Sequence, residues 1–108
     1  MAEKFLERGD FVVEIGSNDG VLLAPLKNLG MRTLGVDPAK NVAEVASKRG
    51  IETMVDYFGE RIAKKIVKEG GKADAIFANN VLAHIDNMED IFKGIKSLLK
   101  KNGILIFS

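Results

Sequence analysis

The stretch from Phe11 to Leu26 reads FVVEIGSNDGVLLAPL. It begins with five mostly apolar residues, Phe11–Ile15, becomes polar and glycine-rich over Gly16–Gly20, and then carries leucines at helical spacing. A short buried strand, a tight loop and a helix in this order predict the first unit of a parallel α/β sheet. Asp19 stands where many nucleotide-binding loops have glycine, so the loop raises the question of which ligand tolerates a carboxylate there.

The rest of the chain repeats this alternation. Apolar runs occur at residues 32–36, 51–55, 73–79 and 103–107, and the segments between them space their apolar residues as helices do. We therefore predict one α/β domain over residues 1–108, with a Rossmann-like parallel sheet of strand order 3-2-1-4-5. Helices should cover both faces of the sheet, and the chain should be truncated after the fifth strand.

The sequence also makes predictions about one proline and about both ends of the last helix. Pro25 is expected inside the first helix, where it would remove one hydrogen bond and bend the axis. Asp86 and Glu89 are expected as the N-cap and capping-box pair of the last helix. The sequence Asn102-Gly103 is expected to end that helix.

The charge pattern and the amino-acid composition indicate which classes of partner to expect. The chain of 108 residues has 16 basic and 15 acidic side chains, mixed along its length, and a net charge of +1. This pattern does not favour nucleic acid or a membrane surface, and no apolar run approaches the ~18 residues of a membrane span. The absence of cysteine excludes disulfides and thiolate metal sites, and we expect no metal. A cytoplasmic domain with a small-molecule ligand is the prediction.

Polar side chains follow each of the first four predicted strands. In open α/β sheets, ligands bind outside the carboxyl ends of the strands, near the switch in strand order. A helix of ~10 residues spans ~15 Å and five strand residues return ~16 Å, so the end of the second strand should lie beside the glycine loop. A carboxylate there commonly accepts hydrogen bonds from both ribose hydroxyls, which predicts an adenosine ligand. The residues concerned are Glu14, Gly16, Ser17, Asn18, Asp19, Gly20, Asp37, Asp56, Asn79 and Asn80.

These residues also have purely structural interpretations. Asp37 could be the N-cap of the following helix, with Pro38 at its first position. Asp56 could cap the third helix in the same way, and Glu14 could satisfy backbone groups of the loop. The loop glycines could serve the turn alone. Capping and ligand binding are compatible, because a capping carboxylate keeps a second oxygen free.

The loop composition argues against a phosphate. A dinucleotide fingerprint reads G-x-G-x-x-G, but here Asn18 replaces the second glycine, and no Lys or Arg lies within the loop to offset Asp19. Two like charges a few Å apart cost on the order of 1 kcal/mol or more. Glu14 and Asp19 suit a ligand with adenosine, an ammonium and a sulfonium, as in S-adenosylmethionine. A nicotinamide dinucleotide remains the weaker alternative.

Three segments, VVEIGSNDGVLL (12–23), GVDPAKNVAEVASKRGI (35–51) and DAIFANNVLAHIDNMEDIFKGIKSLLKKNGILIF (74–107), carry a family resemblance. The chain resembles class I S-adenosylmethionine-dependent methyltransferases, most closely the branch of C-methyltransferases that act on nucleotide-linked deoxysugars. The resemblance implies that the cofactor's methionine part lies near Gly16, Ser17, Asn18 and Gly20, with Asn79 and Asn80 closing over it. It implies that Asp37 holds the ribose, and that Pro38, Asp56, Tyr57 and Phe58 border the adenine.

His84 is the only histidine of the chain. Its ordinary pKa lies near neutrality, which suits a proton acceptor, and in the resembling enzymes a histidine of this loop lies by the acceptor pocket. The alternative is a structural loop residue. Methyl transfer itself is an in-line displacement, so a base is needed only where the acceptor must lose a proton.

The resembling enzymes continue past the fifth strand and carry further domains. We therefore expect a cofactor-binding core, either excised from a longer enzyme or naturally small. The second hypothesis is a domain that binds S-adenosylmethionine without catalysis. A fifth strand at the sheet edge is apolar and open to pairing, which predicts self-association through residues 103–108.

Overall fold

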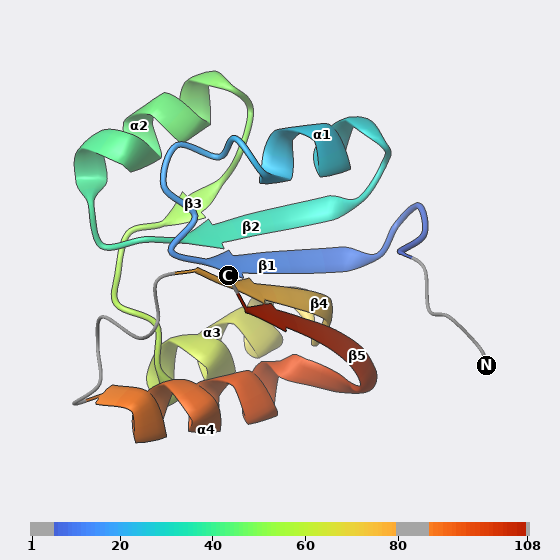
Figure 1. Ribbon diagram of the computed structural model, residues 1–108, viewed down its shortest axis with the longest axis vertical. Coiled ribbons are helices and arrows are strands. Elements are labelled where there is room, and N and C mark those ends of the chain that lie inside the picture. Colours follow the sequence, from blue (N-terminus) through green and yellow to red (C-terminus); the bar gives the residue numbers. More distant parts are fainter. Residues whose placement is uncertain (1–5, 80–86, 108) are drawn as a thin grey trace.

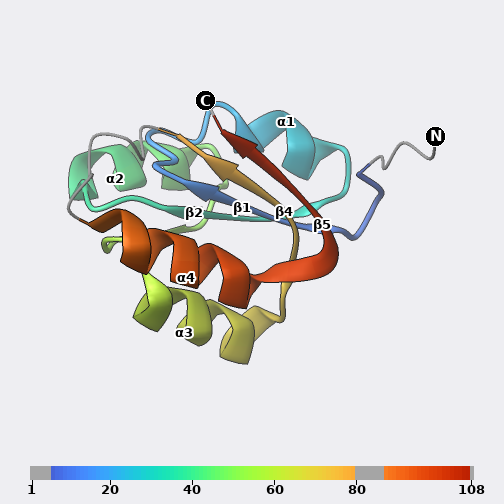
Figure 2. The same ribbon diagram turned by 60° about the horizontal axis from the view of Figure 1, so that its bottom comes forward.

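A computed structural model describes residues 6–79 and 87–107. Its five strands form one parallel sheet in the order β3-β2-β1-β4-β5, which confirms the predicted fold class and strand order. Helices α1 and α2 cover one face of the sheet, and α3 and α4 cover the other (Figure 1, Figure 2). The elements are β1 Phe11–Ile15, α1 Leu23–Asn28, β2 Arg32–Val36, α2 Lys40–Lys48, β3 Thr53–Met54, α3 Glu60–Gly70, β4 Ala73–Ala78, α4 Met88–Leu98 and β5 Leu99–Phe107.

The central strand β1 is buried along its whole length, because helices cover both of its faces. Successive side chains of a strand point to opposite faces, so β1 contributes to two apolar clusters. Val13 and Ile15 belong to the cluster shared with α3 and α4, whereas Val12 belongs to the cluster shared with α1 and α2. Glu14 lies on the same face as Val12, at the carboxyl end of the strand.

Pro25 lies inside α1, as predicted, but the expected loss of a helical hydrogen bond at Pro25 and the predicted end of α4 are wrong. Helix α1 begins at Leu23, so Pro25 lies in the first turn, where a backbone N–H has no partner within the helix in any case. Helix α4 ends at Leu98 and the chain continues directly into β5, so Asn102 and Gly103 do not end the helix. They lie inside β5, where the pairing with β4 skips from Leu99 to Ile104.

The N-terminus of α4 also differs from the prediction. Asn87 takes the N-cap position, and its side chain makes no capping hydrogen bond. Asp86 lies outside the described residues. The Glu89 carboxylate instead lies 3.5 Å from the Lys93 ammonium, one turn along the helix.

Strand β3 is shorter than the predicted run of residues 51–55. It pairs with β2 only at Gly35 and Val36. The chain then runs without regular structure over residues 55–59 before α3 begins. We call residues 55–59 the wall loop, because it forms one side of the cavity described below.

A buried carboxylate joins three strands at the end of the sheet opposite the carboxyl ends of the strands. Asp74 of β4 accepts a hydrogen bond from the Phe11 backbone N–H at 2.8 Å and one from the Lys100 ammonium at 2.9 Å. The starts of β1, β4 and β5 therefore meet at one side chain. Among the described residues, no helix is both long and apolar enough to cross a membrane.

Candidate functional site

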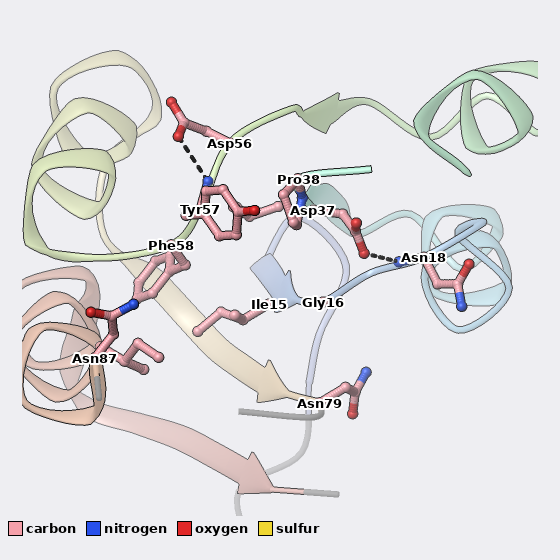
Figure 3. Close-up of a pocket in the computed structure, with 12 residues that line it drawn as sticks. Ile15, Gly16, Asn18, Asp37, Pro38, Asp56, Tyr57, Phe58, Asn79 and Asn87 are labelled. Atoms are coloured by element: carbon pink, nitrogen blue, oxygen red, sulfur yellow. Dashed lines mark hydrogen bonds between the residues drawn. The ribbon is translucent and has the colours of Figure 1, made fainter. Parts of the chain in front are cut away.

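A cavity of about 230 Å³ lies at the carboxyl ends of the central strands (Figure 3). We call it the tip cavity. The structure brings most of the predicted site residues together here, although they come from four separate segments of the chain. The lining residues are Ile15, Gly16, Asn18, Val36, Asp37, Pro38, Asp56, Tyr57, Phe58, Asn79, Asn87 and Ile91.

A larger groove of about 500 Å³ lies beside the starts of β1 and β2, where Phe11, Arg32 and Gly70 line it. The Arg32 guanidinium lies over the Phe11 ring there and donates to the Gly70 carbonyl. Ligands of open α/β sheets bind at the carboxyl ends of the strands. The tip cavity is therefore the candidate site.

Asp37 connects the tip of β2 to the glycine loop. One carboxylate oxygen accepts a hydrogen bond from the Asn18 backbone N–H at 3.0 Å, and the other accepts from the Ala39 N–H at 2.9 Å (Figure 3). Helix α2 begins at Lys40 with Ala39 in the N-cap position, so the interpretation of Asp37 as the helix N-cap is wrong. Each carboxylate oxygen still has capacity to accept a second hydrogen bond.

The loop after β1 depends on unusual backbone angles. Asn18 has a φ of 54°, in the left-handed region that asparagine tolerates better than most residues. Gly16 has a φ of +74°, and a Cβ atom there would lie 2.7 Å from the Asn79 carbonyl oxygen. The Gly16 position thus lets the tips of β1 and β4 approach each other. A Cβ at Gly20 would lie 3.2 Å from the Ala46 side chain, so this glycine packs the loop on α2.

Ser17 does not line the tip cavity. Its side chain is buried, and its hydroxyl occupies the space where Gly35 would carry a Cβ atom. Gly35 pairs with Glu14 in the sheet. The loop therefore folds back over the tip of β2, beside Glu14. Sequence reasoning missed Gly35. The available signal was a glycine between Leu34 and Val36, in the apolar and buried half of the strand, which often marks the close approach of another segment.

Glu14 is a buried carboxyl group immediately behind the cavity, with a side chain that is 3% exposed. One oxygen accepts a hydrogen bond from the Asn79 side-chain amide, and the other has no hydrogen-bond partner among the described residues. Burial raises the pKa of Glu14 to about 7; the Asn79 bond opposes this rise, and the charges of Asp19 and Asp37 add to it. The predicted alternative, in which Glu14 satisfies backbone groups of the loop, is wrong, because the one hydrogen bond that Glu14 accepts among the described residues comes from a side chain.

Asp19 lies outside the tip cavity. Its carboxylate accepts a hydrogen bond from the Val21 N–H at 3.2 Å and lies 3.7 Å from the Arg49 guanidinium. The expectation of an unbalanced negative charge at Asp19 is therefore wrong, because the cation comes from the end of α2 rather than from the loop. Glu14 and Asp37 remain as the acidic groups beside the cavity on this side.

The wall loop forms the opposite side of the cavity. Asp56 accepts hydrogen bonds from the Tyr57 N–H at 2.8 Å and from the Arg61 guanidinium at 3.1 Å, and these two bonds lower the pKa of Asp56. The N-cap position of α3 is Gly59, so Asp56 does not cap this helix. Tyr57 lies beside Pro38, whereas Phe58 points toward the start of α4 (Figure 3).

Sequence reasoning missed the contribution of α4. Asn87 and Ile91 line the cavity, and neither was predicted as a site residue. The predicted residues Asn80 and His84 lie outside the described residues. Within the described ranges, residues 6–79 and 87–107, no group of three or more His, Asp or Glu side chains is placed to hold a metal ion.

A doubly wound parallel sheet with a cavity over its central strand tips, and a carboxylate at the end of the second strand, defines a Rossmann-like nucleotide- or nucleoside-binding domain. Residues 13–107 match the family described as "Methyltransferase domain". The chain belongs to this family of methyltransferase domains.

Two relatives illustrate the similarity. The chain is 37% identical over 99 residues to C-methyltransferase NovU of Streptomyces niveus, covering 92% of this chain and 24% of that protein. It is 27% identical over 97 residues to the ubiquinone biosynthesis O-methyltransferase of Pelagibacter ubique, covering 90% of this chain and 40% of that protein.

A solved structure shares the fold. The S-adenosylmethionine-dependent methyltransferase from Thiobacillus denitrificans, in complex with S-adenosyl-L-homocysteine, superposes with a TM-score of 0.70 at 19% identity. The match covers 94% of this chain and 42% of that one. The chain thus spans less than half the length of these three proteins.

Proposed function

We propose that this chain is the S-adenosylmethionine-binding core of a methyltransferase. The observation that carries the proposal is the chemistry of the tip cavity. Its described lining includes Asp37 and Asp56, amides and apolar side chains, and it includes no Lys or Arg. A pyrophosphate would find no basic partner there, whereas a ligand with a ribose and a positive charge finds acceptors.

The nucleoside is the part of the cofactor that the tip cavity suits best. Asp37 has the capacity to accept hydrogen bonds from ribose hydroxyls while holding its two backbone N–H groups. Pro38, Tyr57 and Phe58 offer apolar surface for an adenine ring. A volume of about 230 Å³ is below the ~300–1,000 Å³ of typical ligand pockets, so only part of the cofactor would lie inside it.

The methionine end would extend over Gly16 toward Asn79 and Glu14. The second oxygen of Glu14 is a buried acceptor without a partner among the described residues, which suits an ammonium donor. When bound, the cofactor would supply a methyl group on a sulfonium, whose sulfur leaves as a neutral thioether. The work of these residues is to hold the nucleoside and the ammonium so that the methyl group points at its acceptor.

We propose a carbon atom of a small molecule, such as a sugar carbon, as the acceptor. The support is the 37% identity to a protein named as a C-methyltransferase, against 27% to a relative named as an O-methyltransferase. A carbon acceptor must lose a proton, and His84 remains our predicted proton acceptor.

Calorimetric titration of the chain tests this proposal. S-Adenosylmethionine and S-adenosylhomocysteine should each saturate one site, and NAD should not compete with them. Saturation by NAD with no heat from either sulfur compound would overturn the proposal. Binding is the appropriate measurement here, because the chain spans less than half the length of the methyltransferases that it matches.

A further inference from the structure

The wall loop has little local structure to hold it in place. It follows a two-residue strand, and the Asp56 N–H bonds to the nearby Met54 carbonyl rather than to another strand. Yet the loop supplies Asp56, Tyr57 and Phe58 to the tip cavity. Some other element must fix its position.

Helix α4 supplies one such contact through Asp90. One oxygen of Asp90 accepts a hydrogen bond from the Glu60 N–H at 3.1 Å, at the first residue of α3. Gly59, in the N-cap position of α3, has no side chain to do this. A Cβ atom at Gly59 would collide with the other oxygen of Asp90, so the carboxylate lies directly against this glycine. The cap of α3 is therefore provided by a neighbouring helix.

Gly94 supplies a second contact one turn further along α4. Residues four apart lie on the same face of a helix, so Gly94 and Asp90 face the same neighbour. A Cβ atom at Gly94 would lie 2.7 Å from the Phe58 ring and 2.8 Å from the Gly59 carbonyl. The wall loop thus rests on the bare backbone of α4, with the Phe58 side chain 8% exposed.

We infer that Asp90 and Gly94 are positioning residues for the tip cavity. Together they hold Phe58 and Gly59 against α4, so that the wall loop stands opposite Asp37 before any ligand arrives. Asp90 is not part of the cavity lining and acts through the loop. The inference rests on the proposed function, because the loop that it fixes is the proposed adenine side of the site.

The chain contains its own reporter for this inference. Tyr57 is its only tyrosine, and tryptophan is absent. Tyrosine fluorescence anisotropy of variants compared at one low protein concentration, where overall tumbling is the same, therefore reports the mobility of the wall loop without a ligand. Asp90→Ala should lower the anisotropy of Tyr57. Asp90→Asn keeps an acceptor oxygen for the Glu60 N–H and should retain the wild-type value.

Glu89→Ala is the matched control, because it removes an exposed carboxylate from the same turn of α4 and, among the described residues, breaks a surface pair with Lys93. It should leave the anisotropy unchanged. In calorimetry with S-adenosylhomocysteine, Asp90→Ala should weaken binding about fivefold to tenfold, the loss expected for one capping hydrogen bond. Asp90→Asn and Glu89→Ala should stay within twofold of wild type, and circular dichroism should show all variants folded.

Wild-type anisotropy in a folded Asp90→Ala protein would overturn the inference, as would equal effects of Asp90→Ala and Glu89→Ala. If the wild-type chain fails to bind S-adenosylhomocysteine, the proposed function fails, and the anisotropy series still decides the positioning role. Gly94→Ala tests the second contact, and the Asp90 variants decide the outcome if that protein does not fold.

Discussion

At the scale of single residues, the site is defined by two carboxyl groups that differ in burial and in hydrogen-bond partners. Asp37 lies in the cavity lining and already binds two backbone N–H groups. Glu14 is buried behind the cavity and shares a hydrogen bond with Asn79. Burial favours the neutral form of Glu14, and a cationic ligand would favour the ionised form. The affinity of the site and the stability of the fold are therefore linked at this residue.

Glu14 should make the stability of the chain fall between pH 4.5 and about pH 7. The folded protein keeps the proton up to a pKa of about 7, from a reference value of 4.5, so the stabilisation present at low pH is lost as the pH rises through 7. The slope is at most ~1.4 kcal/mol per pH unit. Urea unfolding of wild type and Glu14→Gln at several pH values measures it. Parallel curves for the two proteins would contradict the assignment.

Asp37 should carry a large share of the nucleoside affinity. Asp37→Ala removes a charged acceptor and should weaken S-adenosylhomocysteine binding by about 1–3 kcal/mol in calorimetry. Glu44→Ala is the control, because it removes an exposed acid from the adjacent helix α2. Unchanged affinity in a folded Asp37→Ala protein would leave Asp37 with only its structural role between the loop and α2.

At the scale of elements, the sequence predicted what depends on local pattern. The strand β2 and the face of α4 follow from runs and spacings that one segment carries by itself. The contact of Arg49 with Asp19 and the cap that Asp90 gives to α3 could not be predicted. Gly35 signalled that some segment approaches β2 closely, but not that this segment is Ser17. Each contact depends on which elements become neighbours after folding, and the pattern of a single segment does not indicate its neighbours.

Asp74 shows how strongly one side chain can join three elements. Asp74→Ala would leave the Phe11 N–H without its acceptor and should destabilise the fold by about 1–3 kcal/mol in urea unfolding. Lys100→Ala removes only a half-exposed partner and should cost about 0–1 kcal/mol. Equal losses for the two variants would show that the ion pair, rather than the buried backbone bond, stabilises this end of the sheet.

At the scale of the whole molecule, the sheet has an apolar edge. Within the described residues, β5 pairs only with β4, and its Ile106 and Phe107 are 43% and 51% exposed. Phe92 of α4 lies edge-to-face with Phe107 at a centroid distance of 6.4 Å, which extends the apolar surface. Open strand edges of this kind pair with other chains.

The chain should therefore associate with itself as its concentration rises, as sedimentation velocity can measure. Ile106→Lys places a charge on the β5 edge and should shift the protein toward the monomer. Leu29→Lys is the control, since it charges an equally apolar exposed residue that is 65% exposed after α1. A wild-type monomer at all concentrations, or the same shift with both variants, would contradict this expectation.

The central claim is that the strand tips bind a nucleoside that carries an ammonium group and no phosphate. A crystal structure of the chain grown with S-adenosylhomocysteine tests it most directly. The account predicts the nucleoside in the tip cavity, with the ribose hydroxyls within hydrogen-bonding distance of Asp37 and the amino group near Glu14. A tip cavity that stays empty at saturating ligand, or is closed by Tyr57 or Phe58, would contradict the claim.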